Sequence, residues 1–266
     1  MGKVILLTGA SSGLGEQLAI YLSGKGHVVY GTSRSITEQG RGYKVLKMDV
    51  CSEESVQTAV AHILQEQGRI DVLINNAGLG LATPFEHTHM QEIDRLLDTN
   101  IKGVVRTCQA VLPIMRKQNA GLIIQISSIA SEFGLPYRGL YCASKAAMER
   151  FTEALRMEVR KYGIQACIVQ PGGMQTDISK NRLMSFVPGD SPYQASFQRT
   201  LAIVNASVSG GLPTHVFGAA IENIIQAKEV RRVYRIGKFT EKLSVTLKRI
   251  LSSKMFEQIL LKHFEI

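Results

Sequence analysis

The chain has 266 residues, and 31 Lys and Arg against 22 Asp and Glu give it a formal net charge of +9. Hydrophobic residues make up 45% and charged residues 20%, a balance that excludes a mainly disordered protein and predicts a packed globular domain. No apolar run approaches the ~18 residues of a membrane-spanning helix.

Short apolar runs alternate with segments of helical spacing along most of the chain. Ser52-Glu53-Glu54 is typical of a helix N-terminus. In chain order, strands are predicted at 3–8, 27–31, 43–48, 71–74, 121–126, 164–169 and 232–235, with helices at 14–22, 52–67, 90–118, 140–162 and 213–227.

Strands that alternate with helices predict right-handed βαβ crossovers. We therefore expect an α/β fold, a Rossmann-like doubly wound parallel sheet of about seven strands with helices on both faces. No repeat or linker divides residues 1–266, which predicts a single domain. Residues 173–212 interrupt this alternation of strands and helices. They follow the carboxyl end of a strand, where ligands bind in such sheets, and we expect them to form a substrate lid.

The cysteines and histidines indicate neither a metal site nor a disulfide framework. The four cysteines lack CxxC spacing and the six histidines are scattered, so no metal site is expected. The apolar run at the start is too short for a secretory signal. Reduced thiols and a cytoplasmic location are the simplest expectation.

A glycine-rich segment lies between the first strand and the first helix. Its sequence is Thr8-Gly9-Ala10-Ser11-Ser12-Gly13-Leu14-Gly15. Glycines at this place let a pyrophosphate approach the backbone N–H groups and the helix N-terminus. The spacing GxxxGxG is not the general GxGxxG fingerprint, so the segment alone is equally compatible with an ordinary tight turn.

Further polar segments follow later strands in a fixed order. Asn75-Asn76-Ala77-Gly78 closes one strand and Ser127-Ser128 closes the next, with Asn100 between them. Tyr141 and Lys145 are four residues apart, which places them on one face of a helix. Pro171-Gly172 and Thr176 end the series. Together these segments resemble the short-chain dehydrogenase/reductase family over residues 3–235, somewhat like its hydroxysteroid, retinol and lipid-ketone members.

The chemistry of ketone reduction explains three of these side chains. Tyr141 is the candidate acid and base. Because a free phenol has a pKa of about 10, it needs a nearby cation that favours the phenolate, and Lys145 can supply one. Ser128 can hydrogen-bond the substrate oxygen. The resemblance implies the same catalytic set, Ser128, Tyr141, Lys145 and Asn100, with Lys145 on the nicotinamide ribose and Asn100 holding a water.

Ser127 is the alternative to Ser128 as the residue that hydrogen-bonds the substrate oxygen. Only one of the two can reach the substrate, because adjacent strand residues point to opposite faces. The spacing of thirteen residues to Tyr141 selects Ser128. Ser127 is expected to be a hydrogen-bonding wall of the cofactor site.

The segment Tyr30–Ser35 favours NADP(H) over NAD(H). It contains no acid of the kind that holds the adenosine ribose of NAD, whereas Arg34 and a serine such as Ser33 can bind a 2′-phosphate. Asp49 and Val50 are expected beside the adenine, although Asp49 can equally be a helix N-cap. The expected cofactor-binding residues are Gly9, Ser11, Ser12, Gly13, Leu14, Gly15, Ser33, Arg34, Asp49, Val50, Asn76, Ala77, Gly78, Tyr141, Lys145, Pro171, Gly172, Met174 and Thr176.

The substrate is expected to be a hydrophobic alcohol or ketone, such as a steroid, retinoid, fatty or sphingoid compound. Arg138 and Arg182 are the cations that could favour an anionic substrate instead. The expectation rests on the candidate lining residues Phe133, Leu135, Tyr137, Gly173, Met174, Phe186, Val187, Tyr193 and Phe197.

The C-terminal extension, residues 238–266, has apolar residues at helical spacing with interleaved lysines and arginines. A basic amphipathic helix of this kind can lie on a membrane surface or pack on its own domain or a partner subunit. Similar tails occur in members resembling lipid and 17β-hydroxysteroid enzymes. No nucleic-acid recognition motif accompanies the charge, so a nucleic-acid partner is not expected.

The sequence thus predicts an NADP(H)-dependent oxidoreductase that interconverts a ketone or aldehyde and an alcohol. The family resemblance further implies a homodimer or homotetramer. The alternative is a non-catalytic NADP(H)-sensing protein on the same fold, although a sensor has no need to retain the acid.

Overall fold

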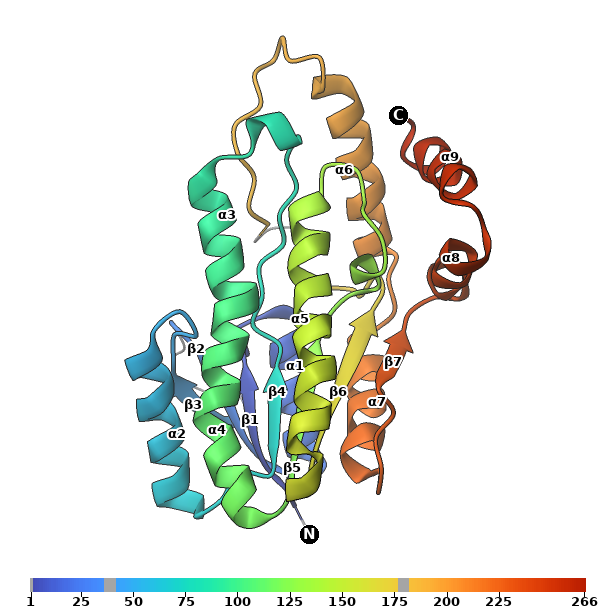
Figure 1. The fold of residues 1–266 in the computed structure, drawn as a ribbon. Helices are drawn as coiled ribbons and strands as arrows, with labels where there is room; N and C mark the ends of the chain where they lie inside the picture. Colours follow the sequence, from blue (N-terminus) through green and yellow to red (C-terminus); the bar gives the residue numbers. More distant parts are fainter. Residues whose placement is uncertain (1, 36–41, 177–181) are drawn as a thin grey trace.

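The computed structural model describes residues 2–35, 42–176 and 182–266. Within them, seven parallel strands form one sheet in the order β3-β2-β1-β4-β5-β6-β7 (Figure 1). This confirms the predicted doubly wound sheet. The strands are β1 Val4–Thr8, β2 Val28–Ser33, β3 Lys44–Lys47, β4 Val72–Asn75, β5 Gly121–Ile126, β6 Ile164–Pro171 and β7 Val233–Ile236.

Helices cover both faces of the sheet. The longer ones are α1 Gly13–Gly24, α2 Glu53–Gln67, α3 Met90–Leu97, α4 Val104–Gln118, α5 Gly139–Val159, α6 Gln194–Ser209, α7 Thr214–Gln226, α8 Phe239–Ile250 and α9 Ser253–Phe264. Strand β1 explains the two layers, because all five of its residues are buried. Leu6 faces the core under α2, α4 and α5, whereas Leu7 faces the core under α1 and α7. Apolar side chains on both faces are what a parallel strand between two helical layers requires.

Three segments differ from the predicted elements. The stretch predicted as one helix over 90–118 is interrupted by a π-helical segment, Asp98–Gly103. The expected lid region, 173–212, contains the sixteen-residue helix α6. The C-terminal extension forms two helices, which separate at Leu251 because Ser252 starts α9 by accepting the N–H of Met255.

The C-terminal extension packs against its own domain. Val245, Phe256 and Phe264 are buried, and the ring of Phe256 lies 5.0 Å from that of Phe133. Helix α9 contacts α6, beside which it runs in Figure 1. One face of the predicted amphipathic tail therefore covers protein. In the described part of the chain, no helix is long and apolar enough to cross a membrane.

The order of the strands reverses between β1 and β4. β1 leads to β2 and β3 on one side, while β4 to β7 extend on the other. The loops after β1 and β4 consequently leave the sheet in opposite directions, which opens a crevice at their carboxyl ends. The glycine turn and the Asn75–Gly78 segment both begin at this crevice.

Candidate active site

The glycine turn after β1 is joined to the loop after β4 by hydrogen bonds. Thr8 Oγ1 accepts the backbone N–H groups of Asn76 and Ala77 at 3.0 and 2.9 Å. Asn76 Nδ2 donates to the carbonyls of Thr8 and Gly9 at 3.0 and 2.9 Å. Gly9 has φ +70°, and a Cβ there would lie 2.7 Å from Ala77 Cα. The two loops thus form one floor that only glycine fits at this position.

The start of α1 completes that floor. A Cβ on Gly15 would overlap the Gly9 carbonyl and the Asn76 amide. Gly13, with φ +58°, lies beside Thr176 from the loop after β6. Ser12 precedes the first helical residue, and its side chain does not cap the helix. A backbone floor at a helix N-terminus suits a pyrophosphate. These residues fit a nicotinamide dinucleotide.

The residues predicted for the adenosine end lie at the carboxyl ends of β2 and β3. Ser33 ends β2, and Arg34 follows it with an exposed side chain. Asp49 accepts the N–H of Cys51 and is not the cap of α2. That cap is Ser52, whose hydroxyl accepts the N–H of Ser55 at 3.2 Å. The N-cap alternative for Asp49 is wrong, because Ser52 stands one position before the helix.

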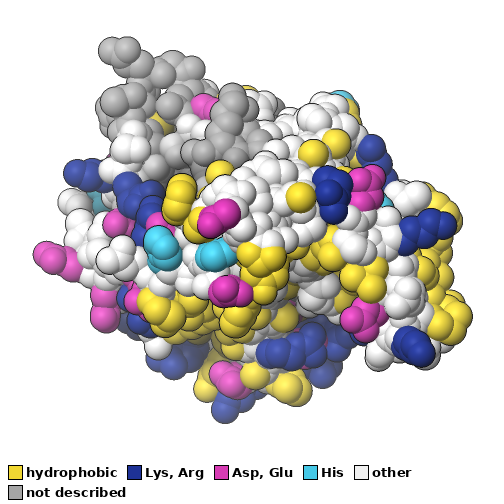
Figure 2. All heavy atoms as spheres, turned by 90° about the horizontal axis from the view of Figure 1, so that it is seen from above, with side chains coloured by type: hydrophobic (Ala, Val, Ile, Leu, Met, Phe, Trp, Pro, Cys, Tyr) yellow, Lys and Arg dark blue, Asp and Glu magenta, His cyan; other side chains and the backbone are white. Residues whose placement is uncertain are grey.

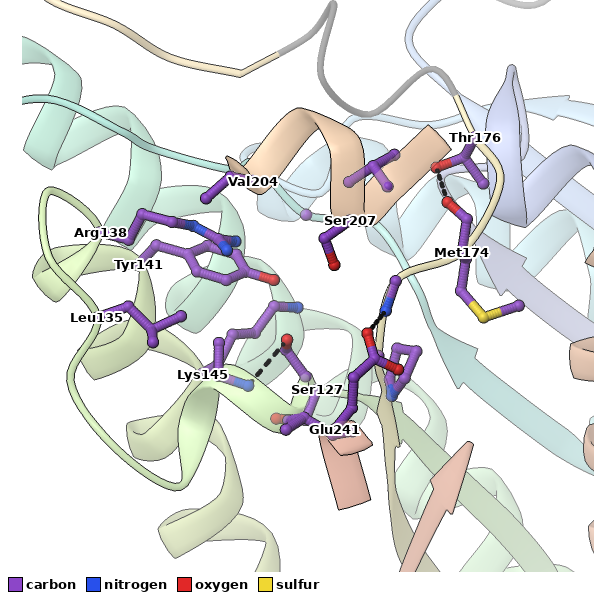
Figure 3. A pocket seen from close by; sticks show the side chains of 18 of the residues that line it. Ser127, Leu135, Arg138, Tyr141, Lys145, Met174, Thr176, Val204, Ser207 and Glu241 are labelled. Carbon is purple, nitrogen blue, oxygen red and sulfur yellow. Dashed lines mark hydrogen bonds between the residues drawn. The ribbon is translucent and has the colours of Figure 1, made fainter. Parts of the chain in front are cut away.

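A pocket of about 260 Å³ continues from the crevice toward α5, α6 and the C-terminal extension (Figure 3). Besides Gly173, thirteen of the residues that line it were expected at the site from the sequence. They are Leu14, Asn76, Gly78, Ser127, Ser128, Leu135, Arg138, Tyr141, Lys145, Pro171, Gly172, Met174 and Thr176. Gly173, a candidate for the substrate side, lines the pocket as well.

Tyr141 is 7% exposed, and its hydroxyl points into the pocket in Figure 3. The guanidinium carbon of Arg138 lies 4.7 Å from the centre of its ring. The cation therefore lies over the ring face and leaves the hydroxyl facing the pocket. Helix α5 brings Tyr141 and Lys145 to the same wall, as their spacing of four predicts.

Lys145 is almost completely buried, with 6% of its surface exposed. Its ammonium donates to the carbonyl of Ile126 at 2.8 Å. Burial lowers the pKa of Lys145 to about 8, against a smaller opposing effect of the Glu149 charge. A Cβ on Gly78 would lie 3.3 Å from Lys145 Nζ, so a larger residue at 78 would crowd the ammonium. A desolvated lysine and a tyrosine that line the same pocket are a pair that can carry out acid–base chemistry on a carbonyl.

Asn100 lies behind this pair and does not line the pocket. Its side chain makes reciprocal hydrogen bonds with the backbone of Leu79, at 2.8 and 2.9 Å, and donates to Ser144 at 3.1 Å. It belongs to the π-helical segment 98–103, and such segments mark functional positions in helices. The segment holds Asn100 against the loop that follows Gly78.

The two serines after β5 have different environments. Ser127 Oγ donates to the buried carboxylate of Glu149 at 2.6 Å, so this hydroxyl is committed to a core network. Ser128 Oγ accepts the N–H of Ala130 at 3.2 Å and keeps its own proton to donate. Both residues line the pocket, and within the described part of the chain Ser128 alone of the two keeps an uncommitted donor.

The other apolar side chains expected around the substrate are placed elsewhere. Phe133 packs on Phe256, the Tyr137 hydroxyl bonds Ser196 Oγ at 2.6 Å, and Phe186 is 75% exposed. Val187, Tyr193 and Phe197 are also absent from the described lining.

Residues that sequence reasoning missed take the places of these side chains. Besides Leu79, Ile126, Ile129 and Ala130, they come from α6 and the C-terminal extension, namely Ile203, Val204, Ser207, Val208, Glu241, His263 and Phe264. The amphipathic spacing of the extension is visible in the sequence, but no motif indicates that it reaches the pocket.

Comparisons with known proteins show the family to which the chain belongs. The short chain dehydrogenase family profile matches residues 3–184. The chain is 42% identical over 259 residues to 3-ketodihydrosphingosine reductase of Bacteroides thetaiotaomicron, covering 97% of this chain and 96% of that one. Human retinol dehydrogenase 8 is 34% identical over 217 residues, 75% of this chain and 69% of its own.

A solved structure supports the same conclusion. An alcohol dehydrogenase from the archaeon Thermococcus sibiricus, complexed with 5-hydroxy-NADP, superposes with a TM-score of 0.73 at 25% identity, covering 90% of this chain and 97% of that one. The chain belongs to the short-chain dehydrogenase family, and it is an oxidoreductase of the class that interconverts alcohols and carbonyl compounds.

Proposed function

We propose that the protein reduces a hydrophobic ketone with NADPH. The observation that carries the proposal is the convergence of Tyr141, Lys145 and Ser128 on one pocket that opens from the glycine floor. A phenol, a buried ammonium and a free hydroxyl supply a proton, a positive charge and a hydrogen bond to one carbonyl oxygen.

Each of these side chains has its own role in the reduction of the carbonyl group. The nicotinamide supplies the hydride when it is bound. Ser128 donates a hydrogen bond to the substrate oxygen, and Tyr141 transfers its phenolic proton to that oxygen. Lys145 favours the resulting phenolate by its charge and holds the ribose hydroxyls. Asn100 ends the proton relay through a water, next to the loop at Gly78.

NADP(H) is the proposed cofactor, with the adenosine 2′-phosphate held by Arg34 and Ser33. Support comes from the exposed guanidinium at the end of β2 and from the lack of an acid in Tyr30–Ser35. A planar guanidinium can bind a phosphate with two parallel hydrogen bonds.

Arg34→Asp is expected to reverse the preference between the two nucleotides. The carboxylate would repel the 2′-phosphate of NADPH and accept a hydrogen bond from the ribose of NADH. Fluorescence titration should find NADPH binding weakened on the order of 100-fold, with NADH binding unchanged or tighter. Arg160→Asp makes the same charge change at an exposed site just after the C-terminal end of α5 and should alter neither affinity. An unchanged ratio of the two affinities for Arg34→Asp would contradict this role.

For the substrate, we propose a long apolar ketone. Support comes from the apolar side chains at the pocket, Leu135, Val204, Val208 and Phe264, and from the activities that the relatives are named for, a ketosphingoid reductase and a retinol dehydrogenase. The insertion 173–212, which includes α6, is proposed as the substrate lid on the basis of its described parts, since 177–181 lie outside the described residues.

The test is to challenge the NADPH complex with ketones of graded polarity. The panel holds 3-ketodihydrosphingosine, a long-chain ketone without the amine, a steroid ketone and retinal. We expect at least one of these ketones to oxidise NADPH, which is followed at the absorbance band of the reduced nicotinamide. A protein that binds NADPH and oxidises it with none of them would favour the alternative, a sensor on the same fold.

Surface features support two further parts of the proposal. Exposed Ile250, Met255 and Ile259 on the outer side of α8 and α9, among lysines, support peripheral contact with an anionic membrane. Figure 2 shows apolar and basic side chains together at the side where this extension lies.

Exposed Val105 on α4 and Met157 on α5 support a homodimer or homotetramer through these helices.

A further inference from the structure

Glu241 connects the C-terminal extension to the loop that follows β6. Its Oε1 accepts the backbone N–H of Gly173 at 2.7 Å, a contact drawn in Figure 3. Its Oε2 accepts the N–H of Lys238 at 2.7 Å, at the start of α8. One carboxylate therefore holds two backbone donors, one in the extension and one in the pocket wall.

The backbone at 172–173, which Glu241 contacts, is closely packed. A Cβ on Gly172 would overlap the Glu241 carboxylate, and a Cβ on Gly173 would overlap the carbonyl of Ser207 in α6. On the other side, the Gly173 carbonyl accepts the N–H of Leu212 at 2.9 Å. The backbone at 172–173 is thus wedged between α6, the segment at 211–212 and Glu241.

The extension is also attached to the segment that follows β5. Arg249 Nη2 lies 3.4 Å from Glu132 Oε2, and Glu132 follows the short helix after Ser128. Phe256 stacks edge-on against Phe133 in the same segment. Helices α8 and α9 therefore contact two of the loops that carry pocket residues, the one after β5 and the one after β6.

We infer that Glu241 is a positioning residue: it fixes the Gly172–Gly173 backbone at the nicotinamide end of the cofactor site and thereby makes the C-terminal extension part of that site. The inference rests on the proposed use of a nicotinamide dinucleotide. It gives the extension a role in cofactor binding in addition to the proposed contact with a membrane. Glu241 touches the loop and acts through it.

Glu241→Gln tests this with little change of shape. A carboxylate accepts from both N–H groups, whereas the amide offers one oxygen and turns an N–H₂ group toward the second donor. Either Gly173 or Lys238 then loses its acceptor, so Glu241 no longer joins the loop to the start of α8. Fluorescence titration should find NADPH binding about tenfold weaker. Binding of 2′-phospho-ADP-ribose, which lacks the nicotinamide, should be unchanged, because its contacts lie at the glycine turn and Arg34.

Glu257→Gln is the matched control. Glu257 is exposed on α9 of the same extension, and its variant should bind both ligands as the wild-type protein does. Unchanged NADPH binding by Glu241→Gln would overturn the inference, as would equal weakening of both ligands, which indicates a general loss of structure. Failure of the wild-type protein to bind either nucleotide would overturn the proposed function as well. If both ligands bind as expected but no ketone is reduced, the proposed reaction is overturned while the inference about Glu241 stands.

Discussion

Replacing Tyr141 by phenylalanine is expected to lower kcat on the order of 10³-fold, because the ring stays in place and only the transferable proton is lost. The hydroxyl points into the pocket, and no hydrogen bond to it is found among the described residues. The ring remains against Arg138 and the core around Leu96 and Leu183. NADPH affinity and the unfolding temperature should therefore stay close to those of the wild-type protein. Steady-state kinetics with the best ketone of the panel, together with a nucleotide titration, measures both.

Tyr162→Phe provides the control for this substitution. Tyr162 lies just beyond the C-terminal end of α5, far from the pocket, and the same loss of a hydroxyl there should leave kcat unchanged. If Tyr141→Phe keeps more than about a tenth of kcat, the proton comes from another group and Tyr141 is not the acid.

Lys145→Met is expected to inactivate the enzyme and at the same time to stabilise the folded protein at neutral pH. Methionine fills the space of the buried lysine side chain without a charge. The lysine pKa of about 8 in the folded protein lies below the unfolded value, so burying the charged form costs roughly 3 kcal/mol. Loss of the hydrogen bond to Ile126 offsets part of this, which leaves a gain of about 1–2 kcal/mol.

The pH dependence of this gain follows from the direction of the shift. Below the folded pKa, both the folded and the unfolded lysine are charged, and the whole cost is present. Between about pH 8 and the unfolded pKa near 10.4, the unfolded chain binds more protons, so wild-type stability rises with pH. The advantage of Lys145→Met should therefore be largest at pH 7 and should shrink toward pH 10.

Urea unfolding of both proteins across this pH range measures the effect, while kcat should fall by about 10²- to 10⁴-fold. Lys117→Met, at an exposed site near the end of α4, should change neither stability nor activity appreciably. A Lys145→Met protein that is less stable than wild type at pH 7 would show that the ammonium stabilises the fold and is not held there at a cost.

The sheet and much of the crevice follow from local features of the amino-acid sequence. Parallel strands covered on both faces need continuous apolar runs, and β1 has such a run from Val4 to Leu7. Backbone turns that need positive φ or close approach require glycine, which makes Gly9 and Gly13 recognisable in the sequence. The helical period is likewise sufficient to place Tyr141 and Lys145 on one face of a helix.

The residues from outside these motifs that complete the pocket depend on the tertiary packing. Glu241, His263 and Phe264 arrive from α8 and α9, and Ser207 from α6, through contacts between segments far apart in the chain. Local spacing shows that the extension is amphipathic, but not which surface its apolar face covers. The π-helical segment at Asn100 was not predicted either, because the apolar spacing over 90–118 indicates a helix without specifying where one turn widens. Periodicity reports the local backbone, whereas the walls of a pocket depend on packing between distant elements.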